Sequence, residues 1–150
     1  YVSGIMVPEG RVLMKKIPYI RWEPFNSVHV DALDEQHRKL FDLVNDLIDE
    51  IELGSHGLLP VVHELADLLA VHFSQEHVVM MQSRYPNIAA HTAEHRRFTE
   101  KLEEFFREYT PGDLAVEHKW ITFLKEWVYH HTTRVDMRYG DHLLKNAQKS

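Results

Sequence analysis

Four stretches of the chain place apolar residues at steps of three and four, the spacing of one face of an α-helix. They cover residues 37–51, 58–80, 88–105 and 120–135. Short segments that contain glycine, proline or asparagine separate them, and such segments end helices. Amphipathic helices joined by short turns bury their apolar faces against one another. The chain is therefore predicted to be all-α, an antiparallel up-down-up-down four-helix bundle.

The start of the chain does not share this pattern. Three of its six prolines lie within the first 24 residues, among short β-like runs without a sustained period. Residues 1–19 are predicted to form an extended N-terminal arm, or a linker from an upstream domain. A length of 150 residues suits one domain, so residues 20–150 are assigned to the bundle.

Composition excludes several classes of function. The chain has no cysteine, which rules out disulfides, thiolate metal sites, iron–sulfur clusters and thiol catalysis. Its 17 basic and 23 acidic residues give a net charge of −6, which argues against nucleic acid as a partner. No run approaches the roughly 18 apolar residues that a membrane span needs. We expect a cytoplasmic protein with no membrane span in this chain.

Histidine is unusually frequent, with twelve in the chain, and five of them interrupt the apolar faces of the four helices. A glutamate does the same. A buried histidine costs free energy unless its nitrogens are paired, and a buried carboxylate costs more unless it is paired or binds a metal. One such histidine is an ordinary core residue with a partner. Together the six predict a metal site: His37, His72, Glu76, His91, His95 and His131.

The spacing of these residues suits chelation. His91 and His95 are four residues apart, so both lie on one helix face, one turn apart, and His72 and Glu76 repeat that step. His131 and Asp136 are five apart, which on a regular helix separates them by about 140°. If both bind the same site, the last helix must loosen, end or take a π-type turn between them.

The ligand types limit the choice of metal. Imidazole and carboxylate without sulfur suit iron, manganese or zinc. Seven candidate ligands exceed the four that close a structural zinc site. Two metal ions that share bridging carboxylates are the simplest arrangement, because the carboxylates offset much of the buried positive charge.

The order of these motifs resembles the hemerythrins, and most closely the bacterial hemerythrin-like domains. The resemblance covers about residues 20–145. It rests on Ile20-x-Trp22, Val28-x-Val30, Asp34-x-Gln36-His37-x-x-Leu40, His72-Phe73-x-x-Glu76 with Met80, Tyr85-Pro86, His91-x-x-x-His95-x-x-Phe98, and Trp127-x-x-x-His131 followed by Asp136.

The resemblance implies a non-haem site of two iron ions with a bridging oxo or hydroxo group. It assigns one iron to three histidines, the other iron to two, and both carboxylates to bridging positions. One position at the second iron stays open for dioxygen. The implied function is reversible dioxygen binding for carriage, storage or delivery, without enzymatic turnover. The implied ligands are His91, His95 and His131 at the first iron, His37 and His72 at the second, and Glu76 and Asp136 as the bridges.

Five residues are expected to line the dioxygen pocket: Phe73, Met80, Trp127, Val128 and Thr132. Thr132 stands where the family prefers a bulky apolar residue. Its hydroxyl can bind water, which predicts faster autoxidation than with isoleucine at this position, and a minor peroxidase activity. Alternatively, the hydroxyl bonds to the helix carbonyl one turn earlier and presents only its methyl group to the pocket.

Two other functions stay open. The same site can serve as an oxygen or redox sensor, with an upstream domain or a protein partner that responds to the bundle. A di-iron peroxidase or oxidase ranks lower, because ferritin-like oxidative sites use paired Glu-x-x-His motifs, which this chain lacks. The remaining histidines are expected in solvent: His29, His56, His63, His77, His118 and His142. His130 is not counted as a ligand, because the apolar face of its helix selects the neighbouring His131.

Overall fold

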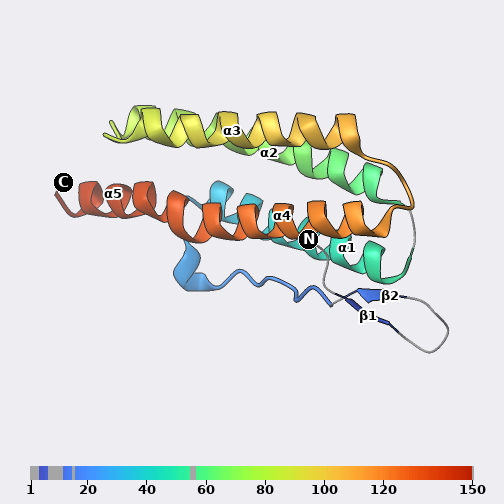
Figure 1. Cartoon of the computed structure of the whole chain (residues 1–150). Coiled ribbons are helices and arrows are strands. Elements are labelled where there is room, and N and C mark those ends of the chain that lie inside the picture. Colours follow the sequence, from blue (N-terminus) through green and yellow to red (C-terminus); the bar gives the residue numbers. More distant parts are fainter. Residues whose placement is uncertain (1–3, 7–11, 15, 55–56, 150) are drawn as a thin grey trace.

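The computed structural model describes residues 4–6, 12–14, 16–54 and 57–149, which form an antiparallel four-helix bundle with an N-terminal arm (Figure 1). The first three helices are α1 (Asp31–Glu52), α2 (Leu58–Gln82) and α3 (Ile88–Glu108). The fourth consists of α4 (Leu114–His130), the π-helical turn η2 (His131–Val135) and α5 (Asp136–Lys149), which follow one another without a gap. The predicted fold class is confirmed.

A polar layer divides the interior of the bundle. The candidate ligands lie between two buried apolar clusters. The larger cluster spans the end where α1 meets α2 and α3 meets α4 (Figure 1), and it includes Leu47, Leu65, Phe105 and Trp120. The smaller cluster lies beyond the ligands, at the α2–α3 turn and α5. It consists of Val28, Leu33, Met80, Tyr85 and Tyr139.

The start of α1 is held by a buried carboxylate. Asp34 accepts hydrogen bonds from the Ser27 hydroxyl at 2.6 Å and from the Val28 amide at 2.9 Å. This places Val28 against α5, where a Cβ built on Gly140 lies 3.0 Å from the Val28 Cα atom. The close approach needs glycine on α5, and it joins the start of the first helix to the last one.

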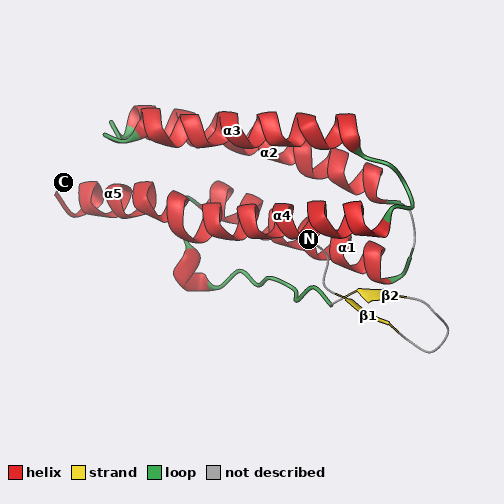
Figure 2. Cartoon of the chain, in the orientation of Figure 1, coloured by secondary structure: helices red, strands yellow, loops and turns green. Residues whose placement is uncertain are grey.

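The N-terminal arm runs alongside the bundle from a hairpin to the 3-10 helix η1 (Pro24–Asn26) (Figure 2). Ile17 and Ile20 are buried in the larger cluster, and the Asn45 side chain exchanges two hydrogen bonds with the Ile20 backbone. The hairpin pairs β1 (Gly4–Met6) with β2 (Val12–Met14) in antiparallel register. These strands were not predicted, because three residues are too few to establish an alternating pattern.

No helix in the described part of the chain has both the length and the apolarity that a membrane span requires.

Candidate metal centre

Seven buried side chains from all four helices of the bundle converge at the polar layer. One comes from α1, two from α2, two from α3, one from η2 and one from α5. The structure brings together every residue that the sequence singled out for a metal site. They are His37, His72, Glu76, His91, His95, His131 and Asp136.

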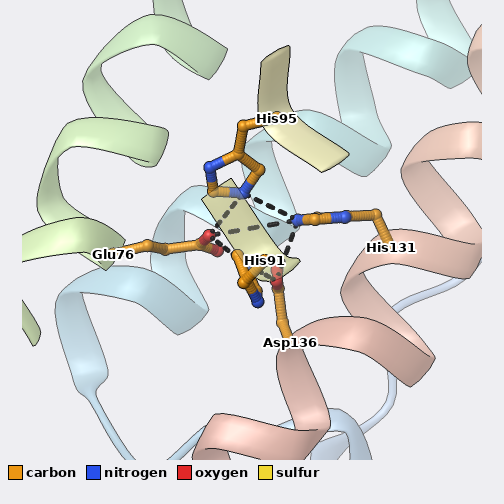
Figure 3. Close-up of side chains that lie close together, drawn as sticks. All are labelled: Glu76, His91, His95, His131 and Asp136. Carbon is orange, nitrogen blue, oxygen red and sulfur yellow. Dashed lines mark hydrogen bonds and ion pairs between the residues drawn. The ribbon is translucent and has the colours of Figure 1, made fainter. Parts of the chain in front are cut away.

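The first group combines three histidines with two carboxylates, and their side chains point toward one another (Figure 3). The Nε2 atoms of His91 and His95 each lie 3.0 Å from Glu76 Oε2. The Nε2 atom of His131 lies 3.0 Å from that of His95 and 2.9 Å from Asp136 Oδ1.

The second group combines two histidines with the same two carboxylates. His37 Nε2 lies 3.0 Å from His72 Nε2 and 3.0 Å from Asp136 Oδ2. The neighbouring Glu76 Oε1 lies 3.7 Å from His37 Nε2. Both histidines are fully buried.

Each carboxylate divides its two oxygens between the two groups. Glu76 directs Oε2 to His91 and His95, whereas its Oε1 faces His37 and His72. Asp136 directs Oδ1 to His131 and His91, and Oδ2 to His37. The two groups are therefore adjacent and share both carboxylates.

The π-helical turn brings Asp136 into the site. In an α-helix, its backbone amide would donate to the carbonyl four residues earlier. Here the amide donates to the His131 carbonyl, five residues earlier. This hydrogen bond stacks Asp136 one turn above His131, so that both side chains face the bundle interior. The five-residue spacing led us to predict a loosened helix, a helix end or a π-type turn here, and the structure has the π-type turn.

Charge pairing outweighs burial for most of these groups. Burial disfavours the charged form of Glu76, but the charge of His72 and the nearby imidazoles of His131 and His37 hold its pKa well below the usual range. Burial likewise disfavours the charged form of His72, yet the charge of Glu76 and the nearby Asp136 carboxylate raise its pKa to about 9. For His95, burial prevails and lowers the pKa.

The donor geometry fits metal ions. Two ligands at right angles around one ion, each about 2.1 Å from it, lie about 3.0 Å apart. Nitrogen–nitrogen and nitrogen–oxygen pairs of both groups have that separation, whereas His72 Nε2 and Glu76 Oε1 lie closer, at 2.5 Å. Although Asp136 Oδ1 lies close to His131, it makes no hydrogen bond among the described residues. A buried oxygen of this kind is costly unless a cation compensates it.

Aromatic rings cover the three-histidine group. Phe73 stacks on His95 with ring centroids 3.8 Å apart, and Trp127 stacks on His131 at 4.4 Å. Val128 is fully buried in the larger apolar cluster, against which Phe73 and Trp127 also pack. Met80, expected to line the dioxygen pocket, is fully buried in the smaller cluster.

Thr132 is buried, and its hydroxyl donates to the Val128 carbonyl at 2.8 Å. The hydroxyl therefore bonds to the helix carbonyl one turn earlier, as in the alternative prediction for this residue.

Three further residues contact the candidate ligands and were given no role in the site from the sequence. The Tyr139 hydroxyl donates to Glu76 Oε1 at 3.2 Å, Gln36 Oε1 lies 2.7 Å from His72 Nδ1, and Glu94 Oε2 lies 3.4 Å from His131 Nδ1. Tyr139 follows Asp136 by three residues, so helical spacing would have identified it. Gln36 and Glu94 are each adjacent to a candidate ligand in the sequence.

The other histidines lie outside this site. Those at 29, 63, 77 and 130 are exposed, as expected. His118 and His142 are half-buried, and His142 Nε2 lies 2.7 Å from the Ser83 carbonyl oxygen. His56 lies outside the described residues.

Two curated relatives of the chain carry the same description. A bacteriohemerythrin of Methylococcus capsulatus is 29% identical over 115 residues, which cover 76% of this chain and 88% of the relative. A bacteriohemerythrin of Stenotrophomonas maltophilia is 27% identical over 122 residues, covering 80% of this chain and 78% of the relative.

Solved structures give the same result. The crystal structure of a wild-type hemerythrin superposes with a TM-score of 0.70 at 25% identity, covering 84% of this chain and 98% of that one. The family model of the hemerythrin HHE cation binding domain matches residues 28–143, which include all seven candidate ligands. The chain therefore belongs to the hemerythrin HHE family.

Proposed function

We propose that this protein binds dioxygen reversibly at two iron ions held by the seven buried residues. The observation that carries the proposal is the division of the carboxylate oxygens between the two histidine groups. Two carboxylates that each face two sets of imidazole nitrogens suit a pair of adjacent cations better than a single one. Dioxygen binding is also the role of the family.

In this proposal, the three-histidine group and the two-histidine group would each hold one iron, and Glu76 and Asp136 would offer one oxygen to each. With a bridging oxo or hydroxo group, the ion at His37 and His72 would have one ligand fewer than the other, so dioxygen would bind on that side. When bound, the iron pair supplies the electrons with which dioxygen is held reversibly.

The contribution of the chain is to orient the ligands and to keep water away. Phe73 and Trp127 cover the imidazoles of His95 and His131 with apolar rings, and Val128 is completely buried. Because the Thr132 hydroxyl is bonded to the Val128 carbonyl, it is not free to bind water. A site kept dry in this way favours release of intact dioxygen over loss of reduced oxygen.

Binding without turnover is favoured by the ligand set. The paired Glu-x-x-His motifs of ferritin-like oxidative sites are missing from the sequence. Five of the seven candidate ligands are neutral imidazoles when they bind a metal, so the site carries less negative charge than a carboxylate-rich one. Less negative charge favours the reduced ions that bind dioxygen.

The test is metal analysis combined with an absorption spectrum, recorded without oxygen and again after exposure to air. We expect two irons per folded chain and a new visible absorption that disappears when oxygen is removed. One ion per chain, or zinc after expression in iron-rich medium, would contradict the di-iron assignment. A spectrum that does not return after oxygen removal would contradict reversible binding.

His91→Ala and His77→Ala form a matched pair for the same test. His91 is buried in the three-histidine group, whereas His77 is exposed on α2 directly after Glu76. The first substitution is expected to lose metal, because the remaining ligands become buried polar groups without a partner. The second is expected to retain two irons. Loss of metal in that variant would mean that the rotation assigned to α2 is wrong.

A further inference from the structure

The five histidines of the candidate metal centre differ at the ring nitrogen that faces away from it. His72 Nδ1 has a side-chain partner at hydrogen-bond distance, Gln36 Oε1 at 2.7 Å. The buried Nδ1 atoms of His37 and His131 make no hydrogen bond among the described residues, and the nearest carboxylate to the latter, Glu94, is 3.4 Å away. Gln36 therefore gives His72 an outer contact of a kind that these two ligands lack.

The orientation of the Gln36 amide is set by a second glutamine. Gln36 Nε2 donates to Gln75 Oε1 on α2, one turn after His72. An amide that uses its NH₂ group in this way presents its oxygen to His72. The oxygen accepts a hydrogen bond from the Nδ1–H group, so the lone pair of the imidazole is on Nε2, the atom that faces His37 and Glu76.

We propose that Gln36 is a positioning residue for the metal position of His37 and His72: it fixes the ring orientation and tautomer of His72 through a neutral hydrogen bond across α1 and α2. This inference rests on the proposed two-ion site and adds to it the residue that determines occupancy of the position with the open coordination site. The contact joins residues 36 positions apart in the chain.

The neutrality of this partner has a consequence for the iron pair. A carboxylate that accepts from the outer nitrogen of a ligating histidine makes the imidazole a stronger donor, and a stronger donor favours the oxidised metal. An amide has this effect more weakly. Gln36 therefore keeps the ion at His37 and His72 easier to reduce than a glutamate in the same place would.

The experiment is a titration of the metal-free full chain with Co(II), whose visible absorption reports each ion without iron or dioxygen. Wild type is expected to take up two ions. Gln36→Leu is expected to bind the first ion normally and the second roughly 10- to 100-fold more weakly, because an outer partner of a ligating histidine has about that effect on metal affinity. Gln36→Glu, which restores an acceptor, is expected to regain the second ion.

Two measurements separate this role from a structural one. In the Co(II) protein, the exchangeable N–H proton of His72 should give a shifted NMR resonance in wild type that is lost in Gln36→Leu. In the iron protein, Gln36→Glu should move the midpoint potential to more negative values. The control is Gln75→Leu, which removes only the outer of the two amides and should weaken the second ion less than Gln36→Leu does.

The outcomes are distinguishable. If wild type takes up a single Co(II), the two-ion site itself is wrong, and the role of Gln36 falls with it. If wild type takes up two ions and Gln36→Leu binds both with unchanged affinity, the two-ion site stands and the role of Gln36 is overturned. An unchanged midpoint potential in Gln36→Glu would likewise overturn the proposed effect of neutrality.

Discussion

The apolar clusters on the two sides of the polar layer differ in size and in the segments that form them. The larger cluster draws on all four helices and on Ile17 and Ile20 of the arm. The smaller cluster has five buried members, and Val28 comes from the segment that precedes α1. One of its members, Tyr139, also bonds to the candidate ligand Glu76.

This difference indicates how the bundle tolerates seven buried polar side chains. Burial of apolar area is the main favourable term in folding, so the larger cluster supplies most of the stability. The smaller cluster lies on the far side of the polar layer and depends on that layer being intact. We therefore expect the end at α5 to respond to metal and the opposite end to be largely independent of it.

The largest effect is expected from Glu76→Ala. It removes one oxygen from each group, so both metal ions should be lost, and the uncompensated histidines should lower the free energy of unfolding by about 3–5 kcal/mol. Metal analysis and chemical denaturation measure the two effects. Hydrogen exchange should show loss of protection near Tyr139 before Leu47, and uniform loss along the bundle would contradict the difference between the two ends.

A core truncation in the larger cluster should have the opposite signature. Leu65 is fully buried there, two turns from His72. Leu65→Ala is expected to cost about 2–5 kcal/mol through lost contacts and the cavity that remains. The folded variant should still hold two metal ions, as measured by metal analysis at low temperature. Loss of an ion would mean that the two ends are more tightly coupled than their separation suggests.

A smaller effect is expected from Gly140→Ala at the other end. The added methyl group meets the Val28 backbone at 3.0 Å, so α5 and the start of α1 must move apart. Overpacking of this kind costs about 1–3 kcal/mol. Thermal unfolding measures the cost, and metal titration should show weaker binding, because α5 carries Asp136. Asp141→Ala, at the exposed neighbouring position, is the control and should change neither quantity.

The smallest effect is expected from Thr132→Val. The Thr132 hydroxyl is already bonded to the Val128 carbonyl, so its removal leaves the same shape toward the pocket. Stability should change by less than about 1 kcal/mol. The oxygenated absorption should decay at the same rate in wild type, Thr132→Val and Thr132→Ile. Markedly slower decay in Thr132→Ile would show that the hydroxyl does admit water.

Helical spacing was sufficient to predict the elements and the residues that face the interior. The apolar steps along α1 to α4 identified the four-helix bundle, and the interruptions by histidine identified the polar layer. The five-residue step from His131 to Asp136 indicated a π-type turn as one of three possibilities, and the structure has that turn. In each case the information is local, because the rotation of a residue about its own helix follows from its position in the chain.

What the amino-acid sequence determined by itself is thus which side chains point inward. The tertiary structure decided which atoms meet: the separate oxygens of Glu76 and Asp136, the contact between Gln36 and His72, and the packing of Met80 in the smaller cluster. These features depend on the axial shift and rotation of one helix against another. Packing of all four helices sets that shift, and periodicity within a single helix carries no record of it.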